Sequence, residues 1–542
     1  MSSVTDLNAS RRGWLETSLI AAVAVGSRLW HLLNAAVSAD LDLVYWPVLA
    51  AQRFEQCALS LAGQGAGADA FSFASPLYIV MITPSYVLGC GRLCVHIAQA
   101  AAGAAVAVLI HRMALGSGAG RVPAAVAAMA WVLYAPAAFY GLTLLPVVPL
   151  ALVVLLWSAL QQRDGTDCGV CPFLSGLAAG VAAGLRPPML LLVVLPLLRA
   201  LRRRRYLSVA KVLAGAALPL LALSALHIHQ NGSAYPFPRS TGINLVLGHS
   251  DGVSGLGPPA PSEGLVETFT EDIHQVAARV AAGRGYESAR EADGYWTRRA
   301  LGWIWRNPGE EIRLVAAKVG GFLGWRQFDV YYDTARARAR DSALRPLFLP
   351  RWAVVFLLAL GIPPFLAGSR WRWALLLPMA VTLLAAVLFV HCERYWLPAL
   401  PSALVASAVG VSVLARTLSR RRWRRAAGML AATVALMLPG ALASPGEVPE
   451  CQYLRGLAVR AWMAEDASRA LTLYERSALC ASDGTVTAVY SRYGALRAAR
   501  ALGMRDRARQ HAVLLAEQLR ASGMAHPGQA DSARIDSFEG RD

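Results

Sequence analysis

Residues 14–34, WLETSLIAAVAVGSRLWHLLN, form the first long apolar stretch of this 542-residue chain, and residues 38–46, SADLDLVYW, follow it directly. A helix of about 20 apolar residues can cross the hydrocarbon of a bilayer, and 14–34 lacks a small-residue cleavage site. It is therefore expected to be an uncleaved membrane anchor. Two carboxylates, Asp40 and Asp42, then stand at the membrane edge, where charge is costly unless it has a function. The alternative is that both simply solvate a loop.

The composition indicates a membrane protein with several spans. The chain is 56% hydrophobic and only 16% charged, whereas soluble globular domains carry about 25% charged residues. The net charge is +18, and arginine clusters lie between apolar runs, which is typical of cytoplasmic loops rather than of nucleic-acid binding. These clusters are Arg11-Arg12, Arg202 to Arg205 and Arg420 to Arg425. Among the eight cysteines no CxxC pair is matched by the second Cys or His pair that a zinc site requires, so neither a metal nor a cofactor is expected.

The apolar windows of the sequence predict an all-α fold of about 11–12 transmembrane helices. The predicted spans are 14–34, 76–91, 93–112, 122–140, 142–160, 172–200, 207–228, 350–367, 373–390, 396–415 and 426–441. Within 172–200, the sequence Arg186-Pro187-Pro188 interrupts helical hydrogen bonding. That window is therefore either one kinked span or two short ones.

The arginine-rich loops also predict the orientation of the chain. Positive-inside counting places the N-terminus and the later arginine clusters in the cytoplasm. Residues 35–75, 229–349 and 391–395, and everything after 441, are then expected outside. Loop 229–349 is expected to be folded, and its amphipathic piece 310–325 to lie in the membrane interface. A helix buried in protein is the alternative for that piece.

After residue 441 the composition becomes that of a soluble domain, with helical apolar periodicity in four segments. These segments are 448–463, 466–480, 484–502 and 504–521. Their repeated Ala, Leu and Tyr resemble a tetratricopeptide-like pair of hairpins. The chain is thus divided into a transmembrane module over 1–441, an external helical-hairpin domain over 442–524, and a disordered tail over 525–542.

Cys451 and Cys480 lie on the first two helices predicted for this external domain. An external domain is in an oxidising compartment, and antiparallel pairing of the two helices brings the start of one near the end of the other. A disulfide between Cys451 and Cys480 is therefore expected, with two ordinary buried thiols as the alternative.

Short motifs recur on, or next to, the segments predicted to face outward. They are Asp42-x-x-Tyr45-Trp46, Ser75-Pro76-Leu77-Tyr78, Gly180-x-x-x-Gly184-Leu185-Arg186-Pro187, Asn231-Gly232, Gly242-Ile243-Asn244 with Gly248-His249, Asn307-Pro308-Gly309 with Lys318, and Glu393-Arg394-Tyr395-Trp396-Leu397-Pro398. In this order, over about residues 14–415, they resemble the glycosyltransferase C superfamily. The resemblance is to the bacterial family-39 enzymes related to protein mannosyltransferases and to the aminoarabinose transferase of lipid A. The chain departs from the family pattern at His249, where asparagine is usual, and in spacing its acids as Asp-x-Asp.

The resemblance implies transfer of a sugar from a polyprenyl-phosphate carrier to a lipid, glycan or protein acceptor, at the periplasmic face of a bacterial inner membrane. Asp42, or else Asp40, is the implied general base that activates the acceptor hydroxyl for attack opposite the leaving phosphate, which predicts inversion. Arg186 and Arg394, and then Lys318, are the candidates to bind that phosphate, because a guanidinium fork matches its geometry.

Further substrate contacts are implied for motif residues whose side chains are polar or aromatic. These residues are Tyr45, Tyr78, Asn244, His249 and Glu393. Each assignment has a plainer alternative, since arginines at span ends extend to lipid headgroups and aromatic residues form interfacial belts.

Two other functions fit the same sequence. A transporter or flippase for a lipid-linked substrate also needs many spans, but the chain shows no inverted repeat and few ionisable residues within its spans. A scaffold that displays the C-terminal helices would explain the residues after 441 but not the acidic pair Asp40 and Asp42.

Overall fold

The computed structural model describes residues 2–35, 50–64, 75–163, 169–232, 234–251, 253, 273–325, 327, 349–368, 372–443, 450–463, 465–481 and 486–522. Within these ranges every regular element is a helix, and one isolated bridge joins Tyr134 to Leu349. The predicted all-α class is confirmed.

The chain forms two compact units. Unit 1 comprises Met1–Pro238, Lys318–Gln327 and Thr334–Ser444, and unit 2 comprises Arg239–Ala317, Phe328–Asp333 and Pro445–Asp542. The described helices of unit 1 are α1 (Ser2–Ala35), α3 (Ala50–Leu61), α4 (Pro76–Val87), α5 (Gly91–Gly116), α6 (Arg121–Leu133), α7 (Ala135–Leu142), α8 (Val147–Arg163), α9 (Cys171–Leu185), η2 (Pro187–Val193), α10 (Val194–Arg202), α11 (Tyr206–Asn231), α17 (Arg351–Gly368), α18 (Arg372–Leu388), α19 (Glu393–Trp396), η4 (Leu397–Ala399), α20 (Leu400–Ser419) and α21 (Trp423–Ala443).

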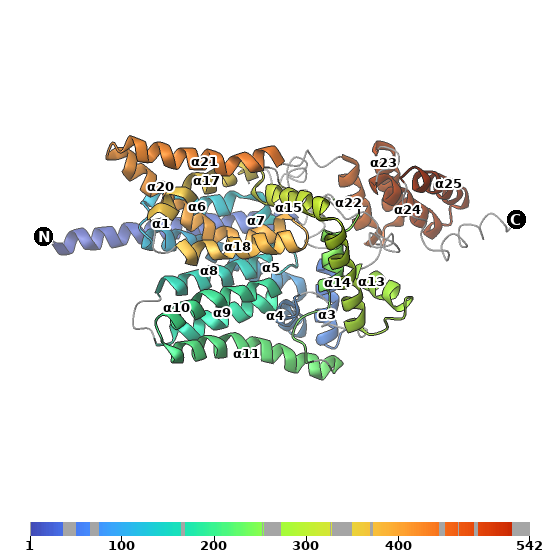
Figure 1. Ribbon diagram of the computed structural model, residues 1–542, viewed down its shortest axis with the longest axis horizontal. Helices are drawn as coiled ribbons and strands as arrows, with labels where there is room; N and C mark the ends of the chain where they lie inside the picture. Colours follow the sequence, from blue (N-terminus) through green and yellow to red (C-terminus); the bar gives the residue numbers. More distant parts are fainter. Residues whose placement is uncertain are drawn as a thin grey trace. The chain divides into compact units, whose positions relative to one another are not determined.

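Helix α20 lies next to α17 and α21 (Figure 1) and is enclosed by helices of unit 1. It packs against α5, α6, α8, α17, α18 and α21, and all its residues from Leu400 to Gly410 are buried. Its sequence is apolar or small on every face, as a helix enclosed by protein requires. Small residues also let α17 come close, since a Cβ added to Gly410 would lie 1.7 Å from the carbonyl oxygen of Gly361.

Three described helices are long and apolar enough to cross a membrane, namely Gly91–Gly116, Tyr206–Gln230 and Glu393–Ser419. The count becomes four if the pair Ala135–Leu142 and Val147–Arg163, bent by 112°, forms one span. Further apolar helices of 10–17 residues accompany them. A polytopic membrane protein fits these helices, but several predicted spans are divided or shortened. The break in 122–140, for example, comes at Tyr134, just before Ala135 and Pro136.

Several helices of unit 1 expose apolar side chains, as a lipid-facing surface requires. On α1 and α11 the exposed apolar residues include Trp14, Leu15, Leu19, Leu29, Trp30, Leu33, Tyr206, Leu207, Leu213, Leu218, Leu221 and Ile228. Soluble monomers rarely expose apolar surface on this scale. The exposed stripes therefore agree with immersion in a bilayer.

Helices α9 and α11 pack side by side and run parallel. A Cβ added to Gly176 would lie 2.0 Å from the carbonyl oxygen of Val212, and one added to Gly180 would lie 2.4 Å from that of Ala216. A residue further along α9 therefore contacts a residue further along α11, as in a parallel pair. The glycines spaced by four allow this close approach, which is typical of helix packing in membranes.

The predicted window 172–200 forms two helical pieces rather than one kinked helix. Helix α9 ends at Leu185, and the extended backbone of Arg186, with φ −155° and ψ 110°, leads into η2 and α10. Pro196 and Ala200 of α10 line the same cavity as Cys171 at the start of α9, so the chain has reversed direction. A residue before proline is driven into extended backbone, which places the reversal at Arg186.

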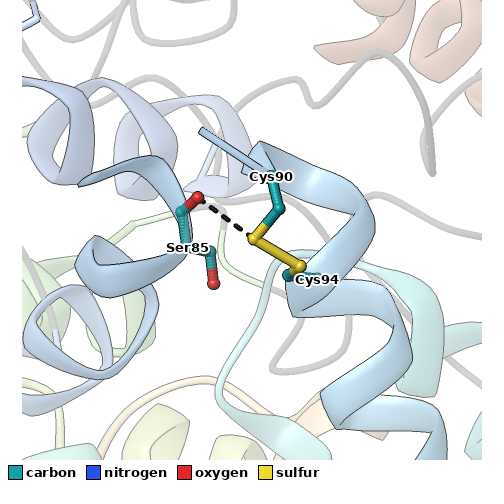
Figure 2. The surroundings of a disulfide bond; sticks show 3 residues. All are labelled: Ser85, Cys90 and Cys94. Atoms are coloured by element: carbon teal, nitrogen blue, oxygen red, sulfur yellow. Dashed lines mark hydrogen bonds between the residues drawn. A yellow bond between two sulfur atoms is a disulfide. The ribbon is translucent and has the colours of Figure 1, made fainter. Parts of the chain in front are cut away.

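Helix α4 is shorter than the predicted span 76–91. Its 12 residues rise about 18 Å, against roughly 30 Å of hydrocarbon. After α4 ends at Val87, a disulfide joins Cys90, the N-cap of α5, to Cys94 in its first turn. Cys90 Sγ lies 3.4 Å from the carbonyl oxygen of Ser85, so the bridge contacts the last part of α4 (Figure 2).

Unit 2 contains α12 (Thr241–Gly248), α13 (Ile273–Ala282), α14 (Ala289–Arg306) and the first part of α15 (Pro308–Leu323). A small core gathers Ile243, Val246, Val276, Ala277, Trp296 and Ala300. Gly242 N donates to Asp293 Oδ1 at 2.7 Å, and a Cβ there would lie 2.2 Å from the Asp293 carbonyl oxygen. Only glycine allows α12 to come this close to α14.

The four predicted C-terminal helices are formed as α22 (Glu450–Met463), α23 (Ala467–Cys480), α24 (Val486–Ala501) and α25 (Arg505–Ser522). Each packs on the next along the chain. They make an array of helical hairpins.

The disulfide expected between Cys451 and Cys480 is not formed. Neither cysteine takes part in a disulfide, and Cys451 is buried whereas Cys480 is exposed. The antiparallel pairing is present, but Ser477 occupies the position opposite Cys451, and its Oγ donates to the Cys451 carbonyl oxygen at 2.6 Å. Cys480 lies almost one turn further along α23, past the contact.

Candidate functional site

Two predicted phosphate-binding arginines lie against the same aromatic ring. The Cζ atom of Arg186 is 4.3 Å from the ring centroid of Tyr395, and that of Arg394 is 5.3 Å away. Arg186 Nη1 also donates to the Arg394 carbonyl oxygen at 3.4 Å, although 208 positions separate the two residues. Two guanidinium groups on one ring concentrate positive charge, and such groups bind phosphate in a bidentate manner.

The local sequence fixes Arg186 at the turn between two helices. Its backbone N–H donates to the Ala182 carbonyl oxygen at 2.8 Å, which closes α9, and Pro187 prevents α9 from continuing. Ser75 Oγ donates to the Leu185 carbonyl oxygen at 2.6 Å. The start of α4 is therefore tied to the residue before Arg186.

Glu393 lies at the start of α19 and is wholly buried. Its carboxylate accepts hydrogen bonds from Arg351 Nη1 and from the hydroxyl of Tyr134. Since protein groups occupy both carboxylate oxygens, Glu393 holds its neighbours in place. A direct contact of Glu393 with substrate stays a prediction.

Arg351 connects this carboxylate to the end of α15. Its Nε donates to the Gly324 carbonyl oxygen at 2.8 Å, and its Nη2 to those of Phe322 at 2.8 Å and Gly321 at 3.2 Å. The last carbonyls of a helix have no partner within the helix, and a cation there also complements the helix dipole. The Arg351 guanidinium lies 4.5 Å from the Trp396 ring centroid as well.

Lys318, the third predicted phosphate ligand, is wholly buried. Its Nζ donates to the Val387 carbonyl oxygen at 2.9 Å, at the end of α18. His391 follows shortly after and packs edge-on against Phe322, with 5.8 Å between ring centroids. Lys318 thus lies inside unit 1 beside the segment that leads to Arg394, and its role as a phosphate ligand stays a prediction.

Tyr78 is also buried rather than set in an interfacial belt. Its hydroxyl donates to Gln99 Oε1 at 3.0 Å, and Gln99 Nε2 donates to the Thr143 carbonyl oxygen at 2.8 Å. Phe54 contacts the ring edge-on, with 5.1 Å between centroids. Tyr78 therefore joins α3, α4 and α5, and any contact with substrate stays a prediction.

Asn244 and His249 belong to unit 2, and both make contacts within it. Asn244 Nδ2 donates to the Ser240 carbonyl oxygen at 2.8 Å. His249 Nδ1 lies 2.7 Å from Glu311 Oε2. The remaining predicted residues, Asp40, Asp42 and Tyr45, lie outside the described residues.

Sequence reasoning missed three residues of unit 1. Arg351 and Tyr134 hold Glu393, yet Arg351 stands at the start of an apolar window and resembles an ordinary end-of-span arginine. Arg28 is 2% exposed in the C-terminal part of α1, where its Nη1 lies 3.4 Å from the Val132 carbonyl oxygen. A charged residue inside an apolar window was the available signal for Arg28.

No protein-family model matches this sequence, and comparison with curated proteins and with solved structures gives no match either.

Proposed function

We propose that this protein transfers a sugar from a polyprenyl-phosphate carrier to an acceptor hydroxyl at the outer face of the membrane. The observation that supports this is the clustering of Arg186 and Arg394 around Tyr395. As the glycosidic bond breaks, the departing lipid phosphate gains negative charge. Guanidinium groups already in position stabilise that charge without rearranging first.

The buried network behind these arginines supports the same role. Glu393 and Trp396 flank Arg394 and Tyr395 in the sequence, and both contact Arg351. Such a rigid second layer holds binding groups in a productive geometry. We assign Glu393 and Arg351 as positioning residues.

The proposed base is Asp42, with Asp40 as the other candidate. The acceptor hydroxyl gives its proton to the carboxylate while its oxygen attacks the anomeric carbon, and the carrier leaves as polyprenyl phosphate. One displacement inverts the configuration of the sugar. Ser75, after the external segment that carries both acids, is hydrogen-bonded next to Arg186.

The proposed topology keeps the orientation expected from the arginine clusters. If α4 stays at the outer face and α9 and α10 cross separately, one span is lost and one is gained relative to the predicted windows. The N-terminus then stays in the cytoplasm and α21 leads outward. About 11 spans result, in a bacterial inner membrane.

The helical array α22–α25 is proposed to be an external, tetratricopeptide-like domain. Its successive packing, α22 on α23, α23 on α24 and α24 on α25, is that of stacked hairpins. Such arrays bind extended partners. A protein acceptor or an assembly partner is the proposed ligand.

The alternative is a transporter for the same lipid-linked substrate. Buried Arg28 and His31 on α1 favour it, because ionisable groups inside a membrane helix often mark a substrate path. The two proposals differ in whether the glycosidic bond of the substrate is broken.

Incubation of purified protein with radiolabelled polyprenyl-phosphate sugars and a membrane extract as acceptor source tests the proposal. Free polyprenyl phosphate and a labelled acceptor of opposite anomeric configuration are expected. Flipping of intact carrier in proteoliposomes, without release of polyprenyl phosphate, would support the transporter instead.

Asp42→Asn is expected to lower the transfer rate by ~10²–10⁴-fold, because the amide cannot accept the proton. Asp506→Asn, on α25, is the matched control and should leave the rate unchanged. Full activity of Asp42→Asn would show that Asp42 is not the general base, and Asp40 would then be the candidate to test.

A further inference from the structure

A cavity lies where four helices of unit 1 end or begin. Its volume is about 230 Å³. The C-terminal parts of α8 and α10 and the N-termini of α9 and α11 surround it, and Arg186 lies at the other end of α9. The cavity is therefore separate from the proposed transfer site.

The cavity has the electrostatics of an anion site. Arg203, Arg205 and Lys211 line it, and no described lining residue is acidic. Because α9 and α11 run parallel, both helices direct their N-termini to this end, where free backbone N–H groups and the helix dipole favour negative charge. Residues 164–168, which include Asp164 and Asp167, lie outside the described residues.

A buried amide adds an independent indication of a ligand. Gln161, at the end of α8, lines the cavity and is 1% exposed. Its Oε1 accepts from Arg199 Nη1 at 3.1 Å, but among the described residues its Nε2 has no hydrogen-bond partner. A buried donor without a partner is costly, and an anion in the cavity would satisfy it.

The rim of the cavity is apolar and exposed, which favours a lipid over a soluble anion. Leu207 lines the cavity and is 71% exposed, and Tyr206 beside it is 69% exposed. Val170 and Leu201 are exposed at the neighbouring helix ends. Acyl chains can contact such residues while a headgroup occupies the polar interior.

We propose that this cavity binds the phosphate headgroup of an anionic phospholipid. Basic pockets between transmembrane helices on the cytoplasmic side are suited to such headgroups. The arginine cluster 202–205 places the cavity on that side by the positive-inside rule. The assignment does not depend on the proposed sugar transfer.

Native mass spectrometry and thermal unfolding of the purified full-length protein test the proposal. Phosphatidylglycerol is the probe, with phosphatidylcholine and inorganic phosphate as comparisons. One retained phosphatidylglycerol and a raised unfolding temperature are expected, with no such effect from phosphatidylcholine. If inorganic phosphate alone gives the full shift and no lipid is retained, the cavity binds free phosphate and the lipid proposal is wrong.

Two variants locate the site. The triple variant Arg203→Gln, Arg205→Gln, Lys211→Gln is expected to weaken phosphatidylglycerol binding on the order of a hundredfold, since each cation near an anionic headgroup contributes roughly a factor of five. Ser208→Leu keeps every charge, fills the cavity and should also abolish retention. Both should match the original protein in unfolding temperature without lipid.

The matched control is Arg422→Gln, Arg424→Gln, Arg425→Gln, in the other exposed arginine cluster. It should retain phosphatidylglycerol fully. An equal loss in this control, or unchanged binding in both cavity variants, would mean that the basic surface attracts lipid without a specific site.

Discussion

At the scale of single residues, Arg351 decides how the candidate site is held. It is 4% exposed, and it links the buried Glu393 to the carbonyls that end α15. A buried ion pair gains little over an apolar pair of the same shape, but loss of one partner leaves an uncompensated buried charge. We infer that the ion pair between Arg351 and Glu393 holds in place the segment that contains Arg394 and Tyr395.

Glu393→Gln should therefore lower the stability of the protein by about 3–5 kcal/mol, because it leaves Arg351 buried without its counter-charge. Thermal unfolding in detergent measures this. Glu310→Gln is the matched control, since it removes the exposed pair with Arg313 at 2.7 Å, and exposed pairs contribute little. Equal shifts for both variants would contradict the positioning role.

Arg186 and Arg394 make a second prediction at this scale. Lysine keeps the charge but loses the planar fork, so Arg186→Lys and Arg394→Lys should weaken polyprenyl-phosphate binding, and alanine should weaken it further. A hydrogen bond to a charged group contributes about 1.5–3 kcal/mol, which corresponds to about tenfold to a hundredfold in Kd.

Arg424→Ala, in an exposed arginine cluster, serves as the control for carrier binding. Unchanged affinity in all four variants at Arg186 and Arg394 would mean that both arginines only extend to lipid headgroups. Equal loss in the control would indicate general charge attraction.

At the scale of elements, helices α9 and α11 run parallel. The arginine cluster of the candidate site lies at the C-terminal end of α9, and the basic cavity lies at its N-terminal end. The sequence Gly180-x-x-x-Gly184, part of the pattern that suggested a transferase, packs against α11 in the structure. A Cβ on Gly184 would lie 3.0 Å from side-chain atoms of Leu223 and Leu77. These glycines let α9 pack closely against its neighbours, and this packing positions Arg186. We expect no contact between the glycines and the substrate.

Gly176→Ala should destabilise unit 1 by roughly 1–3 kcal/mol, because the new Cβ meets backbone of α11 that cannot yield locally. Gly428→Ala, in exposed α21 with nothing within 4 Å, is the control and should be neutral or slightly stabilising. Thermal unfolding of both variants measures the difference. An unchanged unfolding temperature for Gly176→Ala would show that α9 and α11 can move apart at no cost in stability.

At the scale of the whole molecule, the disulfide Cys90–Cys94 bears on orientation. Disulfides persist in oxidising compartments and are rare in the cytosol. With 76–91 as a span, the α4–α5 junction would be cytoplasmic, whereas a short α4 leaves it outside. Cys171 at the start of α9 is also disulfide-bonded, and the same argument would place that end of α9 outside, so the disulfides alone do not fix the orientation.

Labelling of intact cells tests this orientation. In a variant that keeps only Cys90 and Cys94, a membrane-impermeant maleimide should react only after an impermeant reductant is added. A variant that keeps only Cys480 should react without reduction, because Cys480 is an exposed thiol of the C-terminal domain that we propose to be external. If Cys90 and Cys94 react only after the cells are permeabilised, the junction faces the cytoplasm.

The sequence predicted where the C-terminal helices begin and end, but it did not predict which residues of neighbouring helices contact one another. The four C-terminal segments were predicted to within two residues at either end, because amphipathic periodicity is a local property. The pairing of Cys451 with Cys480 was wrong because it depended on a register between two helices, and that register placed Ser477 in the contact. The same limit applies to Tyr78, whose burial follows from α3 and α5.

The sequence by itself determined the helical class, the apolar segments and an interruption of the helix at Arg186-Pro187-Pro188, but it left open whether the chain reverses there. Each of these follows from residues close together along the chain, since apolar length and proline geometry act locally. Only the tertiary structure decided that Arg394 would join Arg186 on one ring and that Arg351 would hold Glu393. These contacts join distant segments, and they arise from how helices pack, which no local pattern of residues specifies.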